Sequence, residues 1–175
     1  MKKIIACFVF LTIATNTFSQ ETVKSKALKL KYTPPEGWIA EEFGDKLDWE
    51  ISGNVLCKCS GAKFSKQHKD GKMNVVIYPS SQSGLDSAKR NFVGVLRFEN
   101  VEKYDKTKNK FFSFERKKSN FTDSKLNKKS FDVIRYFAKV EDHFYIIYAW
   151  QENLNLMSPQ TEKELFQMVN AIEPF

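Results

Sequence analysis

Two cysteines separated by one residue are the most reactive pair of side chains in the sequence. Cys57 and Cys59 flank Lys58, and the third cysteine, Cys7, lies in a segment that we expect to be removed. On a strand both side chains face one side, with Cα atoms roughly 6.5 to 7 Å apart, the upper limit for a disulfide. The pair is therefore either a strained disulfide at a turn or bulge or two unpaired thiols, and redox or metal chemistry is the third alternative.

A metal site or a nucleophilic centre would need further ligands or a base. His68 and His143 are the only histidines, both fall in expected loops, and the spacing of His68 from the cysteines matches no established zinc site. The sequence has no Gly-x-Ser-x-Gly turn and no glycine-rich phosphate loop. We therefore expect no catalytic residue, no metal and no cofactor.

Positive charge is concentrated between residues 103 and 129, which hold ten lysines or arginines against three acids. Such a stretch attracts anions, acidic proteins or phospholipid headgroups, or else forms a solvated face that keeps a domain in solution. Arg116, Lys117 and Lys118 lie at its centre. We take these three residues as the centre of a contact face for a partner.

Aromatic residues within the basic stretch could complete this contact face. Phe111 and Phe112 are consecutive, so on a strand they must face opposite sides of the sheet. If one sheet face is uncovered, a phenylalanine is exposed among lysines and forms a docking patch, for which we select Phe112. If the sheet is covered on both faces, both rings are buried.

The first twenty residues have the pattern of a secretory signal peptide. Two lysines precede an apolar run over residues 4–13, and small or polar residues follow. The run is too short for a membrane span, which needs about 20 residues. We expect cleavage near Ser19 or Gln20 and a periplasmic or secreted chain without a transmembrane segment. Cys7 lies inside the apolar run, where lipid attachment is not expected.

The composition of the remaining chain indicates one packed domain. Removal of the two N-terminal lysines leaves 26 basic against 21 acidic residues, and 42% of the whole sequence is hydrophobic. This composition argues against disorder, and the 16 phenylalanines favour sheets. We expect residues 21–27 to be a short tether and residues 28–175 a single domain. Nucleic acid is not an expected partner, because no base-reading motif is present.

Hydrophobic periodicity predicts strands followed by a helix, then strands and a second helix. Alternation predicts strands over 28–32, 47–51, 55–59, 73–78, 111–116, 131–140 and 144–150, with Asp70-Gly71 as a hairpin turn. Spacings of three and four predict a helix from about Gly84 to Glu99, and Ser158-Pro159 predicts the start of another. The fold class expected is α+β: an antiparallel sheet of about six strands flanked by helices.

The chain also resembles the PsbP-like superfamily, which includes DcrB-type periplasmic proteins. The resemblance lies in the turn Tyr32-Thr-Pro-Pro-Glu-Gly-Trp38 and in the C-terminal Val-Asn-Ala-Ile-Glu-Pro, and it extends from about Leu28 to Phe175. It implies an α/β/α sandwich. It implies no shared catalytic residues, since members of the superfamily are assembly and binding factors with unrelated roles.

These observations favour an exported, non-enzymatic binding module that acts through protein contacts in the cell envelope, as an immunity-type protein or an assembly factor. The expected partner is another envelope protein, acidic in character. Two alternatives remain open. One is an envelope accessory protein that binds lipid or another anionic small molecule in a cleft between helix and sheet. The other is a thiol redox or metal protein that uses Cys57 and Cys59.

Overall fold

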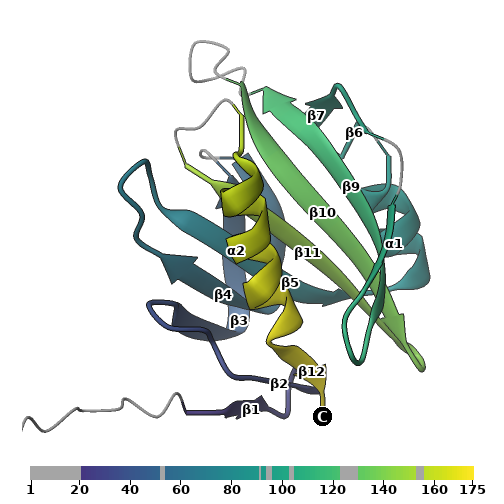
Figure 1. Cartoon of the computed structure of the whole chain (residues 1–175). Helices are drawn as coiled ribbons and strands as arrows, with labels where there is room; N and C mark the ends of the chain where they lie inside the picture. Colours follow the sequence, from purple (N-terminus) through teal and green to yellow (C-terminus); the bar gives the residue numbers. More distant parts are fainter. Residues whose placement is uncertain are drawn as a thin grey trace, which may run out of the picture.

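Antiparallel strands dominate the computed structural model of the chain (Figure 1). It describes residues 21–51, 54–90, 92–93, 96–102, 105–122, 130–152 and 156–175. The described strands form two sheets, one of three strands and one of nine, and every pairing in them is antiparallel. The predicted signal peptide lies outside the described residues. Neither of the two described helices is long and apolar enough to cross a membrane.

The nine-stranded sheet is built around the hairpin of β10 and β11. Its order is β3-β4-β5-β11-β10-β9-β7-β6, and β8 also pairs with β9. β8 pairs with the first half of β9 and β7 pairs with the second half. These two short strands therefore follow one another along the same side of β9. The strands are Ile39–Ile51 (β3), Asn54–Lys66 (β4), Met73–Ser80 (β5), Phe92–Val93 (β6), Leu96–Glu99 (β7), Asp105–Lys108 (β8), Ser113–Thr122 (β9), Ser130–Val140 (β10) and His143–Gln151 (β11).

The smaller sheet joins the two ends of the described chain. Its order is β1 (Val23–Ser25), β2 (Leu30–Tyr32) and β12 (Ile172–Pro174). Tyr145 of β11 donates a hydrogen bond of 2.8 Å to the carbonyl of Leu28, and Tyr32 donates one of 2.6 Å to Glu42 of β3. These two phenol hydroxyls tie the small sheet to the large one.

Helix α2 (Pro159–Asn170) covers one face of the large sheet (Figure 1). Ser158 caps it, since its hydroxyl accepts the amide hydrogen of Thr161 at 3.1 Å, and Pro159 occupies the first helical position, where no amide donor is needed. The buried stripe of α2 packs on the main core together with side chains from β2, β4, β5, β9, β10 and β11. The buried residues of the helix are Thr161, Leu165, Met168 and Val169.

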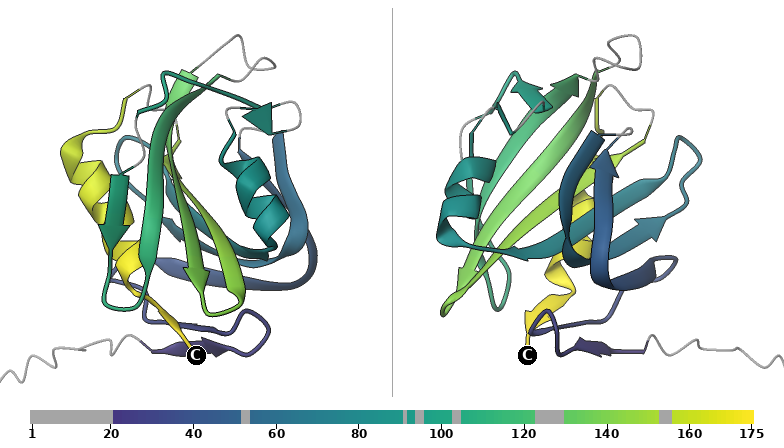
Figure 2. Two further views of the ribbon diagram at one scale, coloured as in Figure 1. Left: turned by 90° about the vertical axis from the view of Figure 1, so that its right-hand side faces the viewer. Right: turned by 180° about the vertical axis from the view of Figure 1, so that it is seen from behind.

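Helix α1 (Gln82–Ala88) lies on the opposite face of the sheet (Figure 2). Leu85 and Ala88 pack into a second apolar cluster that contains residues of β5, β7, β9, β10 and β11. Arg135 of β10 is fully buried here and donates hydrogen bonds of 2.8 and 2.9 Å to the carbonyls of Ala88 and Arg90. Its guanidinium also lies 3.8 Å from the ring centroid of Phe98. A cation therefore satisfies carbonyls at the C-terminal end of α1, where the helix dipole favours positive charge.

The expected fold of about six strands flanked by helices in an α/β/α sandwich is wrong. The described chain is mainly antiparallel β structure with nine strands in its principal sheet and two helices, the first only seven residues long. The expected strands at 47–51 and 55–59 belong to a pair of 13-residue strands. The expected C-terminal helix, the central hairpin of 131–150 and the turn at Asp70-Gly71 are confirmed.

The predicted helix from Gly84 to Glu99 accounts for part of the error. The helix ends at Ala88, and residues 92–93 and 96–99 are strands. Phe98 is buried and pairs in register with Phe121 of β9, with the two ring centroids 5.9 Å apart. Burial of this aromatic pair at the sheet edge outweighs the helical spacing of the local sequence, because helix propensity contributes only tenths of a kcal/mol per residue.

Candidate functional site

An exposed basic strand lies at one edge of the large sheet. Within the described part of the chain, β8 is paired with β9 on one side and has no strand on the other. Lys106 and Lys108 are exposed, as are Lys110 and Phe111 in the turn that follows. We call these four residues the basic edge. An open strand edge presents backbone donors and acceptors to a partner, and the lysines give this edge a positive field.

A local hydrogen-bond pattern shapes the turn between β8 and β9. The side-chain oxygen of Asn109 accepts the amide hydrogens of Phe111 and Phe112 at 2.8 and 2.5 Å. The amide of Asn109 donates to the carbonyl of Phe112 at 3.0 Å. This Asx-type turn holds Phe111 outward, 38% exposed, with the ammonium of Lys110 5.1 Å from its ring centroid.

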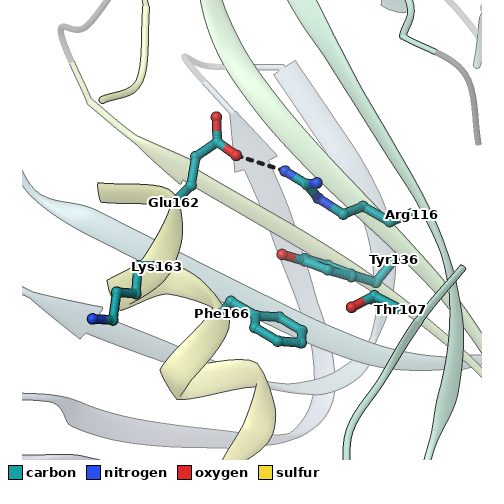
Figure 3. A pocket seen from close by; sticks show the side chains of 6 residues that line it. All are labelled: Thr107, Arg116, Tyr136, Glu162, Lys163 and Phe166. Atoms are coloured by element: carbon teal, nitrogen blue, oxygen red, sulfur yellow. Dashed lines mark hydrogen bonds and ion pairs between the residues drawn. The ribbon is translucent and has the colours of Figure 1, made fainter. Parts of the chain in front are cut away.

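Beside the basic edge, a groove of about 300 Å³ runs between α2 and strands β8, β9 and β10. Figure 3 shows Arg116 and Glu162 facing each other at one end, with the rings of Tyr136 and Phe166 along the floor. These two rings are stacked with centroids 6.0 Å apart. The groove is lined by Thr107, Arg116, Tyr136, Glu162, Lys163 and Phe166.

Glu162, in the first turn of α2, holds the cations of the groove. One of its oxygens accepts from Arg116 at 2.6 Å and the other from Lys118 at 2.5 Å. Lys118 also lies 3.7 Å from the buried carboxylate of Asp132. Burial by itself lowers the pKa of Lys118. The hydrogen bond and charge of Glu162, together with the charges of Asp132 and Glu102, raise that pKa by more than burial lowers it, so the net shift is upward. These charges fasten α2 to β9 and are satisfied within the chain.

Tyr136 carries the polar group on the floor of the groove. Burial raises the pKa of its phenol far above the usual value, and the nearby positive charge of Arg116 offsets only part of that shift. The hydroxyl therefore remains protonated at any physiological pH and can donate a hydrogen bond. A neutral phenol, two stacked rings and an arginine can hold an anionic group with an apolar body, but they supply no base or nucleophile.

The strand divides the predicted basic trio between two faces. Arg116 and Lys118 point to the α2 face, whereas Lys117, between them, is buried on the α1 face and donates to the carbonyl of Lys89 at 3.0 Å. Burial lowers the pKa of Lys117, and the charge of Arg135 lowers it further. The three consecutive side chains thus do not form one surface, because strand residues alternate.

Phe112, the aromatic residue selected from the sequence, lies in the core. It is 3% exposed, and its ring stacks on Phe114 at 5.4 Å and meets Tyr145 edge-on at 6.3 Å. The exposed ring is that of its neighbour, Phe111. Phe112 lies on the α2 face of the large sheet, and side chains of α2 and of the small sheet belong to the same core cluster.

The two predicted cysteines lie in β4, where register joins Cys57 to Trp49 and Cys59 to Leu47. Cys59 is half-buried against the α1-side cluster and carries a disulfide. The side chain of Cys57 is outside the described residues, so its pairing with Cys59 stays a prediction.

The two histidines lie in separate segments: His68 is in the connection after β4, and His143 is the first residue of β11. In the residues that the structure describes, no group of three or more His, Cys, Asp and Glu side chains could hold a metal ion.

Sequence reasoning missed the residues of α2 and β10 that line the groove. Glu162 is separated from Lys118 by 44 residues and from Arg116 by 46, so no local pattern joins them. The available signal was the spacing of Arg116 and Lys118, which places two cations on one face of a strand and calls for an acid opposite them.

Comparisons with known proteins add no function. No family model matches the chain, and no curated protein matches it. A crystal structure of a Bacteroides thetaiotaomicron VPI-5482 protein at 1.50 Å resolution is similar with a TM-score of 0.46 and 10% sequence identity, over 88% of this chain. This chain spans about half the length of that protein, of which 48% is covered.

Proposed function

We propose that this chain is a non-enzymatic binding module of the cell envelope that holds a partner protein by an acidic, extended segment paired with β8. The observation that carries the proposal is the open edge of β8, whose exposed side chains include two lysines, with a third in the turn. An added strand gains main-chain hydrogen bonds whatever its sequence, and the adjacent side chains set its specificity.

The two faces of β8 define the segment that fits. Thr107 is paired with the buried Phe114, so it lies on the α2 face and lines the groove. Lys106 and Lys108 must then lie on the opposite face. A matching strand carries acids on the side of the lysines and uncharged residues on the side of the groove. Opposite charges on neighbouring strands contribute roughly 0.2–1 kcal/mol per pair.

We assign partner selection to Lys106 and Lys108 of β8 and not to Arg116 and Lys118, which are already bound to Glu162. The bond of 2.5 Å between Lys118 and Glu162 and that of 2.6 Å between Arg116 and Glu162 would have to break before either cation met a new acid. Lys106 and Lys108 are exposed, and no ion pair between them and another described residue would have to break. The export of the module, as an immunity-type protein or an assembly factor, rests on the N-terminal signal pattern.

The test is a titration with a fluorescent peptide that alternates glutamate and valine, against a lysine–valine peptide of equal length. We expect the wild-type protein to bind the acidic peptide, K106E/K108E to bind it at least about tenfold more weakly, and affinity to fall with salt. The control is K26E/K69E, which changes the same net charge at exposed sites outside β8. Equal binding by both double variants, or no binding by the wild type, would contradict the proposal.

A second candidate function is the binding of an anionic amphiphile, and the groove favours it. Its volume of about 300 Å³ reaches the lower end of the range for ligand pockets, and it combines stacked rings with the phenol hydroxyl of Tyr136 as a hydrogen-bond donor. A fatty acid and an alkyl phosphate form a second arm of the same titration. Binding of these probes that is unchanged in K106E/K108E would assign the activity to the groove instead of the strand edge.

A further inference from the structure

The two edges of the large sheet carry opposite charge. β3 stands at the end of the strand order opposite to β8 and β9. Its 13 residues, Ile39–Ile51, include five acids and one lysine. β8 and the following turn carry three lysines and one acid over residues 105–110. In the described part of the chain both strands are paired on one side alone.

We propose that the acidic strand bound by β8 is β3 of a second copy of this chain, so that copies assemble head to tail through a continuous sheet in which β8 and the incoming β3 run parallel. This inference rests on the proposed function, because it names the partner of the same strand edge. Opposite charge is the property that joins the two edges, and backbone pairing supplies the contact.

The charged side chains that would meet lie on the same face of the sheet. Ala40 packs on the main core beneath α2, so Glu41, the next residue of β3, is directed to the α1 face. Lys106 and Lys108 also lie on that face, because Thr107 between them lines the groove on the α2 side. Glu41 and both lysines are exposed. β3 and β8 run in the same direction, because six successive antiparallel pairings separate them. Joining them as parallel strands therefore brings opposite charges side by side, with the α1 faces of both copies on the same side of the sheet.

Symmetric dimers are disfavoured by the same charges. Pairing β3 with β3 would set acids against acids, and pairing β8 with β8 would set lysines against lysines, both of which are destabilising. The remaining combination is heterologous, with a different surface on each partner. Heterologous contacts build rings when their rotation closes and filaments when it does not. The apolar side chain of Ile39, 64% exposed at the start of β3, adds area to this contact.

The experiment is sedimentation velocity over a range of protein concentrations. K106E/K108E makes both edges acidic, and E41K places a lysine on the acidic edge. We expect the wild type to self-associate, each variant to sediment as a monomer, and an equimolar mixture of the two variants to associate again. K26E/K69E should behave as the wild type. Association should weaken between about 0.1 M and 1 M salt, where the Debye length shortens from about 10 to 3 Å.

The outcomes separate this inference from the proposed function. A wild type that stays monomeric at every concentration but binds the glutamate–valine peptide overturns head-to-tail assembly and leaves the proposed function standing. Association that survives both substitutions also overturns the inference, as does a variant mixture that remains monomeric. Circular dichroism melts of the variants establish that each is folded, so that loss of association reports on the edge charges.

Discussion

The carboxylate of Glu162 holds α2 on the sheet, and its replacement by glutamine tests this clamp. Glu162→Gln removes one negative charge opposite Arg116 and Lys118 and retains the size of the side chain. Hydrogen bonds to charged groups contribute about 1.5–3 kcal/mol, whereas fully exposed ion pairs contribute about 0–1 kcal/mol. The three side chains are 24%, 23% and 15% exposed, between these limits. We expect the free energy of unfolding to fall by about 2 kcal/mol.

Urea denaturation followed by circular dichroism measures this loss. For a domain of this size, about 2 kcal/mol corresponds to a decrease in Tm of roughly 4–8 °C. A double-mutant cycle of Glu162→Gln with Lys118→Met isolates the pair. Glu173→Gln is the matched control, because Glu173 pairs with Lys31 at 2.8 Å but both side chains are a third exposed. We expect that control to cost less than about 1 kcal/mol.

Two results would refute the reasoning. One is a loss for Glu162→Gln no larger than that for Glu173→Gln, which would mean that the short contacts contribute no more than a surface pair. The other is a coupling energy with position 118 of less than about 0.5 kcal/mol, the usual limit of additivity for independent sites. Either would show that the carboxylate of Glu162 does not hold α2 on the sheet.

Two further predictions concern acid stability and a turn. The hydrogen bond from Gln160 lowers the pKa of Glu164 below 4.5 and Lys66, at 3.1 Å, lowers it further. A carboxyl group whose pKa is lower in the folded state than in the unfolded state stabilises the fold at pH values above its unfolded-state pKa. That contribution is lost as the pH falls through the folded-state pKa. The stability difference between wild type and Glu164→Gln should therefore shrink from pH 7 to pH 3 in urea denaturation, and a constant difference would exclude this cause. Gly71 has φ +130°, and an added Cβ would lie 2.2 Å from the carbonyl oxygen of Glu152. The substitution Gly71→Ala should therefore lower the free energy of unfolding by more than about 1 kcal/mol in the same assay. A neutral result would contradict the turn geometry.

Local signals in the sequence were sufficient for several elements. The start of α2 follows from a cap residue and a proline that are adjacent in the chain, and the β4–β5 turn follows from Asp70-Gly71. The hairpin of β10 and β11 follows from two apolar runs joined by a short turn. In each of these, the residues that decide the structure lie within a few positions of one another, so a pattern reveals them.

The lengths and neighbours of other elements depend on contacts between distant residues. Phe98 belongs to a strand because Phe121 lies beside it, and α1 accordingly stops at Ala88. The same dependence applies to the basic stretch, where the sequence shows charge but not which cations are already paired. In the structure, Glu162 of α2 holds Arg116 and Lys118, whereas Lys106 and Lys108 are exposed.

The sequence by itself determined that this chain is rich in aromatic strands, that a cation-rich segment follows residue 102, and where the C-terminal helix begins. Only the tertiary structure decided that Lys117 is buried, that Phe112 is core and that Glu162 neutralises Arg116. The physical reason is that strand alternation and capping are properties of neighbouring residues, whereas burial and ion pairing depend on which distant segments pack together.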